Sequence, residues 1–231
     1  MKRWAWVVAG LYGLILAALT VPVTMLAFVG QAKFAEVAEV YAHWPYWIWL
    51  VVMVISQVAL LSVPVRVASR RPVSRSSLLP TILAAGLMMG GLAGGAVCSV
   101  YEFACQDQGK GNWIWWTATG IAALTWSVWA LIFFRISQNE NTNGTISRQC
   151  RWLLKGSILE LLIAVPTHVV ARYRDYCCAG VMTFIGLAMG TAVMLFSFGP
   201  AVYFLFVERW RRLHPQPQTP FAAEDSHLQQ T

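Results

Sequence analysis

The chain has 231 residues and a net charge of +7; 58% of its residues are hydrophobic and only 12% are charged. Soluble domains carry about a quarter charged residues, so this composition and the mean hydropathy of +0.56 exclude an ordinary soluble enzyme or binding domain. The positive charge has a simple source, because membrane proteins concentrate basic residues in the loops of one side, and we expect no nucleic-acid partner.

Six apolar runs match or approach the roughly 20 residues that a helix needs to cross a bilayer core. The first is too long for a cleavable signal peptide and lacks a clear cleavage site, so it counts as a span. The sequence therefore predicts an all-α polytopic membrane protein with six transmembrane helices over residues 1–213. A polar tail rich in proline and glutamine, residues 214–231, is expected to be disordered. The predicted spans are Trp4–Val29, Pro45–Val67, Pro80–Phe103, Trp113–Phe134, Leu153–Val170 and Ala179–Val207.

Two of the connections between spans have a recognisable pattern. In the first outer loop, residues 31–44 place Phe34, Val37 and Tyr41 at helical spacing. This spacing predicts a short helix that lies in the membrane interface. The fourth connection, residues 137–149, reads SQNENTNGTISRQ and is predicted to be a polar cytoplasmic loop.

Basic residues are distributed unevenly over the two sides of this topology. With the N-terminus inside, 13 of the 17 lysines and arginines lie on the cytoplasmic side. This bias follows the positive-inside rule. We therefore expect an integral protein of a bacterial inner (cytoplasmic) membrane with both termini in the cytoplasm. The basic residues predicted on the outer side are Lys33, Lys110, Arg172 and Arg174.

Glycines recur at four-residue spacing in the third and sixth spans. Glycines spaced in this way open a groove on one helix face and let another helix approach closely. The approaching helix belongs either to this bundle or to another subunit, and a flat cofactor is a further candidate. The glycines concerned are Gly86, Gly90, Gly91, Gly94 and Gly95 in the third span and Gly186 and Gly190 in the sixth.

The fifth span breaks the apolar pattern, because it contains Glu160, Pro166 and His168. Ionisable groups inside a span are expensive and are functional hypotheses by default. At a rise of 1.5 Å per residue, Glu160 is expected roughly 10 Å from the cytoplasmic start of the span. It is either a protonated carboxyl that is hydrogen-bonded across the bundle or a group that handles protons or cations.

The outer end of the same segment suggests a ligand site. His168 lies one turn before Arg172, so the two can share a helix face, and His43 is expected near the same boundary. A histidine there is an interfacial hydrogen-bonding residue or a ligand for a metal or haem, and two histidines at one depth would sandwich a haem. Arg172 and Arg174 would bind its propionates or the phosphate of a lipid or ligand, or would simply contact headgroups.

Four of the five cysteines are predicted to lie on the outer side, where an oxidising compartment favours disulfides. Cys177 and Cys178 are adjacent and rarely bridge each other, because their Cα atoms are only about 3.8 Å apart. Cys105 is therefore expected to bridge one of them. The alternatives are a soft-metal site such as Cu(I) built from Cys98, Cys177 and Cys178, a thiol relay, or free thiols.

These features leave several functions open. The first is a non-catalytic subunit or scaffold that docks into a larger membrane assembly, since the loops are short and leave little room for a soluble catalytic domain. The second is an outer-face metal, haem or thiol-redox module built on His168 and the Cys177–Cys178 pair. The others are a small transporter that uses Glu160 and an intramembrane enzyme acting on lipids, although standard catalytic motifs are absent. The expected partners are the lipid bilayer and other membrane subunits.

Labelling of single cysteines tests the predicted topology. In a background whose five native cysteines are serine, cysteines at Arg71 and Asn143 should be shielded from an impermeant thiol reagent in intact cells, because both positions are predicted to be cytoplasmic. A cysteine at Gln108 should be labelled. Labelling at position 143 from outside would contradict the six-span topology.

Overall fold

The protein is helical throughout the part of the chain that the structure describes. The structure is a computed structural model, and it describes residues 2–27, 41–68, 78–104, 113–139, 142–174 and 180–213. These residues contain no strand, which confirms the predicted all-α fold. Six helices in them are long and apolar enough to cross a membrane, so the chain is an integral, multi-pass membrane protein. The helices are α1 (Lys2–Ala27), α3 (Trp44–Ala68), α4 (Leu79–Ala104), α5 (Trp113–Asn139), α6 (Thr142–Arg172) and α7 (Val181–Leu213).

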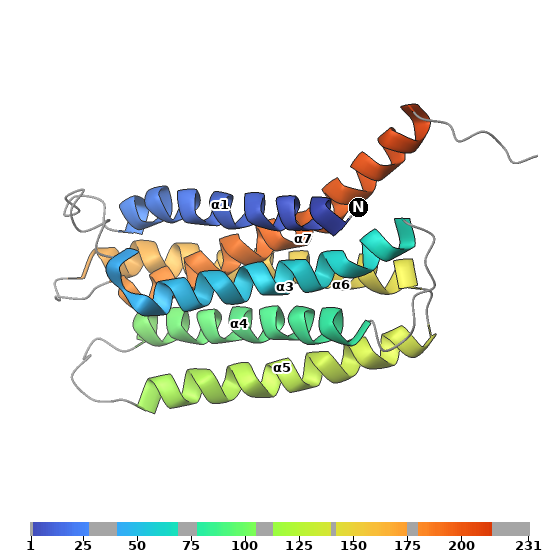
Figure 1. Ribbon diagram of the computed structural model, residues 1–231. Helices are drawn as coiled ribbons and strands as arrows, with labels where there is room; N and C mark the ends of the chain where they lie inside the picture. Colours follow the sequence, from blue (N-terminus) through green and yellow to red (C-terminus); the bar gives the residue numbers. More distant parts are fainter. Residues whose placement is uncertain are drawn as a thin grey trace, which may run out of the picture.

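Helix α4 is central to the bundle (Figure 1) and packs against α3, α5, α6 and α7. Helix α5 packs mainly against α4, whereas α1 and α3 pair with each other and both contact α7. The largest side chains of the core they enclose are fully buried and include Met53, Leu60, Met88, Phe133, Leu153 and Phe196.

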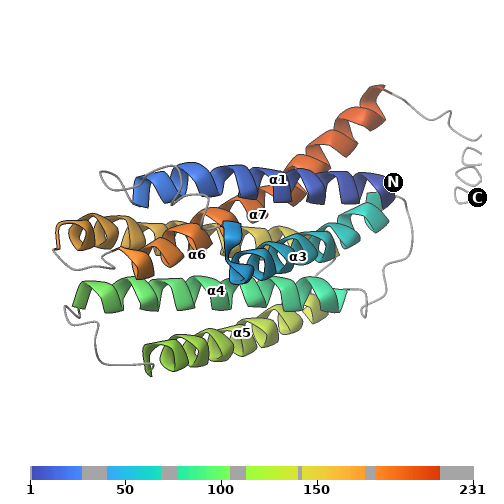
Figure 2. The same cartoon turned by 60° about the vertical axis from the view of Figure 1, so that its left-hand side comes forward.

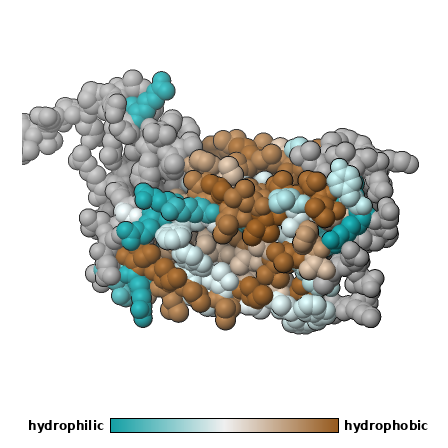
Figure 3. Space-filling view, turned by 180° about the vertical axis from the view of Figure 1, so that it is seen from behind, coloured by the Kyte–Doolittle hydropathy of each residue, from teal (hydrophilic) through white to brown (hydrophobic). Residues whose placement is uncertain are grey.

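The lateral surface of the bundle is apolar. In Figure 3 hydrophobic side chains cover much of the face seen from behind, and most hydrophilic ones lie toward its two ends. Large hydrophobic side chains point outward, such as Trp116 at 76%, Leu124 at 68% and Leu162 at 67% exposure. In water such a surface would drive aggregation, whereas in a bilayer these side chains contact lipid.

The glycines of α4 are used for packing inside the bundle. A Cβ at Gly90 would lie 2.6 Å from the backbone oxygen of Ala122 in α5, and one at Gly86 would lie 3.2 Å from the backbone of Ala130. A Cβ at Gly91 would overlap the methyl group of Met189 in α7. The prediction of close helix approach within this bundle is therefore confirmed.

The connection between α5 and α6 is much shorter than the sequence predicts. Helix α5 continues to Asn139 and α6 begins at Thr142, so a polar loop over residues 137–149 is wrong for most of its length. The added turns of α6 are amphipathic: Ile146 is buried together with the polar side chains of Thr145 and Gln149. Because most of these residues are polar, the sequence alone does not reveal that they form a buried helix face.

Helix α7 changes direction near its middle. Its last part leaves the bundle and points away from the other helices (Figures 1 and 2). The sequence of this helix contains a Gly199-Pro200 pair, and a proline inside a helix removes a helical hydrogen bond and bends the helix. The predicted interfacial helix falls mainly within residues 28–40 and the predicted disordered tail within residues 214–231, and both segments lie outside the described residues.

Alanine substitution at two glycines tests the close approach of α4 and α5. Gly90→Ala should lower the free energy of unfolding by about 1–3 kcal/mol, because a backbone oxygen of α5 cannot move aside without shifting the helix. Gly120→Ala in α5 is the matched control, since its Cβ would meet nothing within 4 Å. It should be neutral or stabilise by up to about 1 kcal/mol through helix propensity. Thermal unfolding in detergent measures both, and equal effects would contradict the packing.

Candidate functional site

Arg174, which follows the span that contains Glu160 and His168, contacts the last turn of α4. We call this the Arg174 end of the bundle, the end at which α4 finishes and α7 begins. The Arg174 guanidinium donates from Nη1 to the carbonyl oxygen of Glu102 at 2.7 Å and from Nη2 to that of Phe103 at 2.6 Å. Carbonyls in the last turn of a helix lack partners within that helix. Arg174 therefore caps α4, and its use as an anion site stays a prediction.

The side chain of Glu102 accepts hydrogen bonds from the backbone at the start of α7. It is fully buried, and its Oε1 accepts a hydrogen bond from the backbone N–H of Gly180 at 2.5 Å. Its Oε2 accepts one from the backbone N–H of Thr183 at 2.7 Å. These are the two donors that a capping box satisfies at the start of a helix. A single carboxyl group of α4 thus caps α7, whose positive dipole end attracts negative charge.

Gly180 is the residue that makes this cap possible. Its φ is 95°, in the region that residues with a side chain rarely adopt. A Cβ there would lie 3.0 Å from both Arg172 Cδ and His168 Cε1. Its carbonyl accepts the first helical hydrogen bond of α7, from the N–H of Phe184 at 2.9 Å. The sharp turn into α7 therefore needs a glycine.

His168 belongs to the same contact region. Its ring is 7% exposed, and its Nδ1 lies 2.7 Å from the Thr183 hydroxyl, which also donates to the Gly180 carbonyl at 3.1 Å. His43 is exposed and precedes α3 at the edge of an apolar cavity. The two histidines thus contribute to different sites, and a haem between them stays a prediction without support from these contacts.

The predicted metal and disulfide sites are only partly within the described residues. Cys98 is buried in α4 as a free thiol, whereas Cys105, Cys177 and Cys178 lie outside the described residues. No cluster of three His, Cys, Asp or Glu side chains that could hold a metal occurs among the residues that the structure describes. The soft-metal site and the disulfide therefore stay predictions.

Glu160 lies in a slot made by three glycines. Its side chain is 2% exposed, and neither carboxyl oxygen has a hydrogen-bond partner. A Cβ at Gly95 would lie 3.0 Å from Oε1, one at Gly186 2.7 Å from the same oxygen, and one at Gly190 would overlap Oε2. We call these three residues the glycine slot. The glycines leave room for a carboxyl group between α4, α6 and α7.

Glu160 lies well inside α6. Because this helix begins at Thr142 and ends at Arg172, Glu160 lies about 27 Å along the helix from its start and about 18 Å from Arg172, at 1.5 Å per residue. Its depth of roughly 10 Å from the cytoplasmic start of the span stays a prediction.

Polar side chains extend from the glycine slot to the Arg174 end. A Cβ at Gly186 would contact Ser99 Oγ as well as Glu160 Oε1, so both oxygens lie against the same glycine. Ser99 is buried one turn before Glu102 on α4. We call this set the polar column; its members are Ser99 and Glu102 of α4, Glu160 and His168 of α6, and Thr183 of α7.

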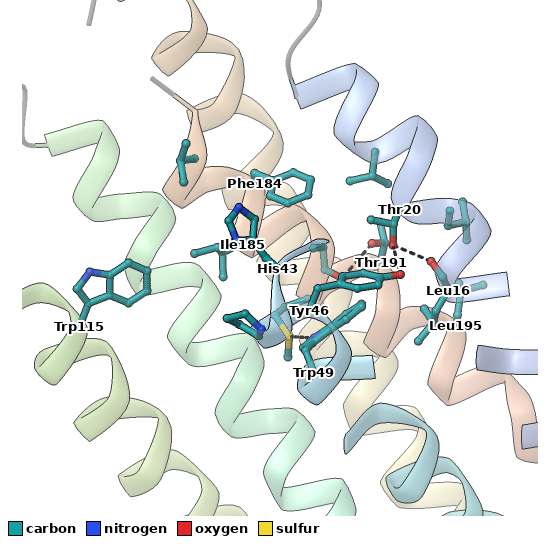
Figure 4. A pocket seen from close by; sticks show the side chains of 16 residues that line it. Leu16, Thr20, His43, Tyr46, Trp49, Trp115, Phe184, Ile185, Thr191 and Leu195 are labelled. Carbon is teal, nitrogen blue, oxygen red and sulfur yellow. Dashed lines mark hydrogen bonds between the residues drawn. The ribbon is translucent and has the colours of Figure 1, made fainter. Parts of the chain in front are cut away.

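A second site lies on the other face of α7. It is a cavity of about 560 Å³, between α1, α3, α5 and α7 (Figure 4). Trp115 of α5 lies on one side of it, and Tyr46 and Trp49 of α3 lie on another. Helix α7 also lines the cavity, with Phe184 and Ile185 among its lining residues. We call it the apolar cavity.

Sequence reasoning missed three of the five members of the polar column. Glu102 lies inside the predicted span Pro80–Phe103, so the rule that singled out Glu160 applies equally to it. Ser99 and Thr183 carry no comparable signal, because hydroxyl side chains are common in membrane helices and usually bond to their own backbone.

Comparison with known protein families, with curated proteins and with solved structures finds no match for this chain. The fold and the two sites define a six-helix integral membrane protein with a buried polar column and an apolar cavity.

Substitution of Glu102 tests the shared cap. Glu102→Leu should lower the free energy of unfolding by about 1–3 kcal/mol for each backbone donor left unsatisfied. Glu102→Gln keeps one acceptor oxygen and should lose less. Tyr173→Leu is the control: this residue is 86% exposed next to Arg174 and should change stability by less than about 0.5 kcal/mol. Wild-type stability of Glu102→Leu in a detergent unfolding assay would contradict the cap.

Proposed function

We propose that the protein binds one lipid molecule of the surrounding bilayer by its hydrocarbon chain, in the apolar cavity. The cavity volume of about 560 Å³ falls within the usual range of small-molecule sites, about 300–1,000 Å³. All four helices that line it are long and apolar enough to span the membrane. Where such helices cross the bilayer core, a cavity between them meets hydrocarbon rather than water.

The chemistry of the wall supports an apolar occupant. Its few hydroxyl groups are already bonded within the protein: Thr20 donates to the carbonyl of Leu16 at 2.9 Å, and Thr191 to that of Leu187 at 2.7 Å. The indole N–H of Trp49 points to the sulfur of Met189 at 3.1 Å. A polar ligand would lose its hydration and gain few partners there. The mainly apolar wall, whose threonine hydroxyl groups are bonded within the protein, is the observation that carries the proposal.

The aromatic residues around the cavity fit the same occupant. Tyr46 and Trp49 of α3 lie near Thr20 and Thr191 on one side, and Trp115 of α5 stands opposite (Figure 4). Rigid aromatic side chains offer large apolar contact areas at a small cost in conformational entropy. A flexible hydrocarbon chain adapts to such a wall without needing directional contacts.

Three of the functions expected from the sequence gain no specific support from the described residues: the scaffold, the redox module and intramembrane catalysis. The glycines of α4 that would dock another subunit contact α5, α6 or α7 instead. Docking into a larger assembly therefore stays a prediction, as do the redox module and intramembrane catalysis.

Lipid analysis of the purified protein tests the proposal. Native mass spectrometry in mild detergent should find one lipid retained per chain. Ala188→Trp should remove it, because the indole would fill the cavity that Ala188 lines. Leu124→Trp is the matched control, since Leu124 is 68% exposed on α5 and does not line the cavity.

The two variants should show the same thermal unfolding, so that loss of lipid is not loss of fold. Equal lipid retention by Ala188→Trp and Leu124→Trp, or no retained lipid in the wild type, would contradict the proposal.

A further inference from the structure

We infer that Glu160 is a proton-binding site that exchanges its proton with solution at the Arg174 end, through the polar column. This inference is independent of lipid binding, because the polar column and the apolar cavity use different faces of α7.

The contrast between two buried carboxyl groups is the first argument. Glu102 and Glu160 are 0% and 2% exposed. Glu102 accepts two backbone hydrogen bonds, as expected for a structural group, whereas both oxygens of Glu160 lack a partner. A buried polar group without a partner destabilises a protein, and an ionised one does so far more. A protonated carboxyl is therefore the form that the glycine slot accommodates.

Among the described residues, the three helices that form the glycine slot place no charge beside Glu160 that would pair with it. Helix α7 has no titratable side chain between Gly180 and Gly199. Helix α4 contributes Cys98 and Glu102, and α6 contributes His168, all toward the Arg174 end. On the opposite side the nearest charged group of α6 is Lys155, whose ammonium lies 5.4 Å from the ring centroid of Trp152.

The access route is the second argument. From the slot, the Ser99 hydroxyl lies against the same glycine as Glu160 Oε1. Beyond Ser99, Oε2 of Glu102 accepts a hydrogen bond from the backbone N–H of Thr183 at 2.7 Å, and the Thr183 hydroxyl lies 2.7 Å from Nδ1 of His168. Carboxyl, hydroxyl and imidazole groups all donate and accept protons. The Ser99 hydroxyl donates to the Gly95 carbonyl at 3.0 Å, so the proposed path is stepwise and requires rotation of this side chain.

The opposite side of the slot is mainly apolar. Leu92 of α4, Leu153 of α6 and Val193 of α7 are buried in the hydrophobic core. The polar group of α6 on that side, Ser157, is one turn from Glu160 and donates to the Leu154 carbonyl of its own helix at 2.9 Å. The polar column contains two further ionisable side chains, Glu102 and His168, so the proton is assigned to that route. The exchange moves one proton between the carboxyl group and water and involves no electron transfer.

Infrared spectroscopy of the full-length protein in detergent tests the inference. The spectrum should contain a carbonyl band of a protonated carboxyl group that disappears in Glu160→Gln. In D₂O, this band should shift as the proton is replaced by a deuteron. Ser99→Ala and His168→Phe should slow the shift roughly tenfold, the effect of losing an interaction worth about 1.4 kcal/mol in the exchange barrier. Ser157→Ala is the control on the mainly apolar side and should exchange like the wild type.

Three results would overturn the inference. The first is the absence of any protonated-carboxyl band that Glu160→Gln removes. The second is a band that shifts only when the protein unfolds, which would make Glu160 a static buried group. The third is exchange slowed by Ser157→Ala but not by Ser99→Ala, which would place the access on the opposite side. Thermal unfolding of each variant shows that the differences arise in folded protein.

Discussion

The buried Glu102 carboxyl group joins the end of α4 to the start of α7. Its hydrogen bonds fix the position of the two helices along each other. It takes two backbone N–H groups at the start of α7, and the carbonyls of its own helix end accept from Arg174. Helix ends leave backbone groups without partners, and here side chains from other segments supply them. The start of α7 is capped by the Glu102 carboxyl group of α4, and the end of α4 is capped by Arg174, which follows α6.

The register set by this cap determines what lies deeper in the bundle. Because Thr183 is held at Glu102, the next turns of α7 place Gly186 and Gly190 beside Glu160. On α4, Gly95 and Ser99 lie two turns and one turn before Glu102 and meet the same residues. A shift of α7 by one residue would bring residues with side chains into the glycine slot. Even a single Cβ added at Gly190 would overlap the Glu160 carboxyl group. Helix α7 then presents its other face, with Phe184 and Ile185, to the apolar cavity.

The number and approximate position of the helices follow from the sequence, because apolar length is dictated by the bilayer. The start of α6 does not follow, since Thr145 and Gln149 look like loop residues and yet are buried. Glu160 is visible in the sequence as a carboxyl group in an apolar run, but its lack of a partner depends on glycines from two other helices. The cap at Gly180 is equally hidden, because its acceptor is 78 residues away along the chain.

Amide hydrogen exchange at the start of α7 tests the shared cap most directly. The first amides of a helix have no partner within the helix and ordinarily exchange quickly. If Glu102 holds α7 as described, the amides of Gly180 and Thr183 exchange as slowly as that of Phe184, which makes the first helical hydrogen bond of α7. Exchange at Gly180 and Thr183 that is at least roughly tenfold faster than at Phe184, equivalent to about 1.4 kcal/mol less protection, would contradict the cap and the register that depends on it.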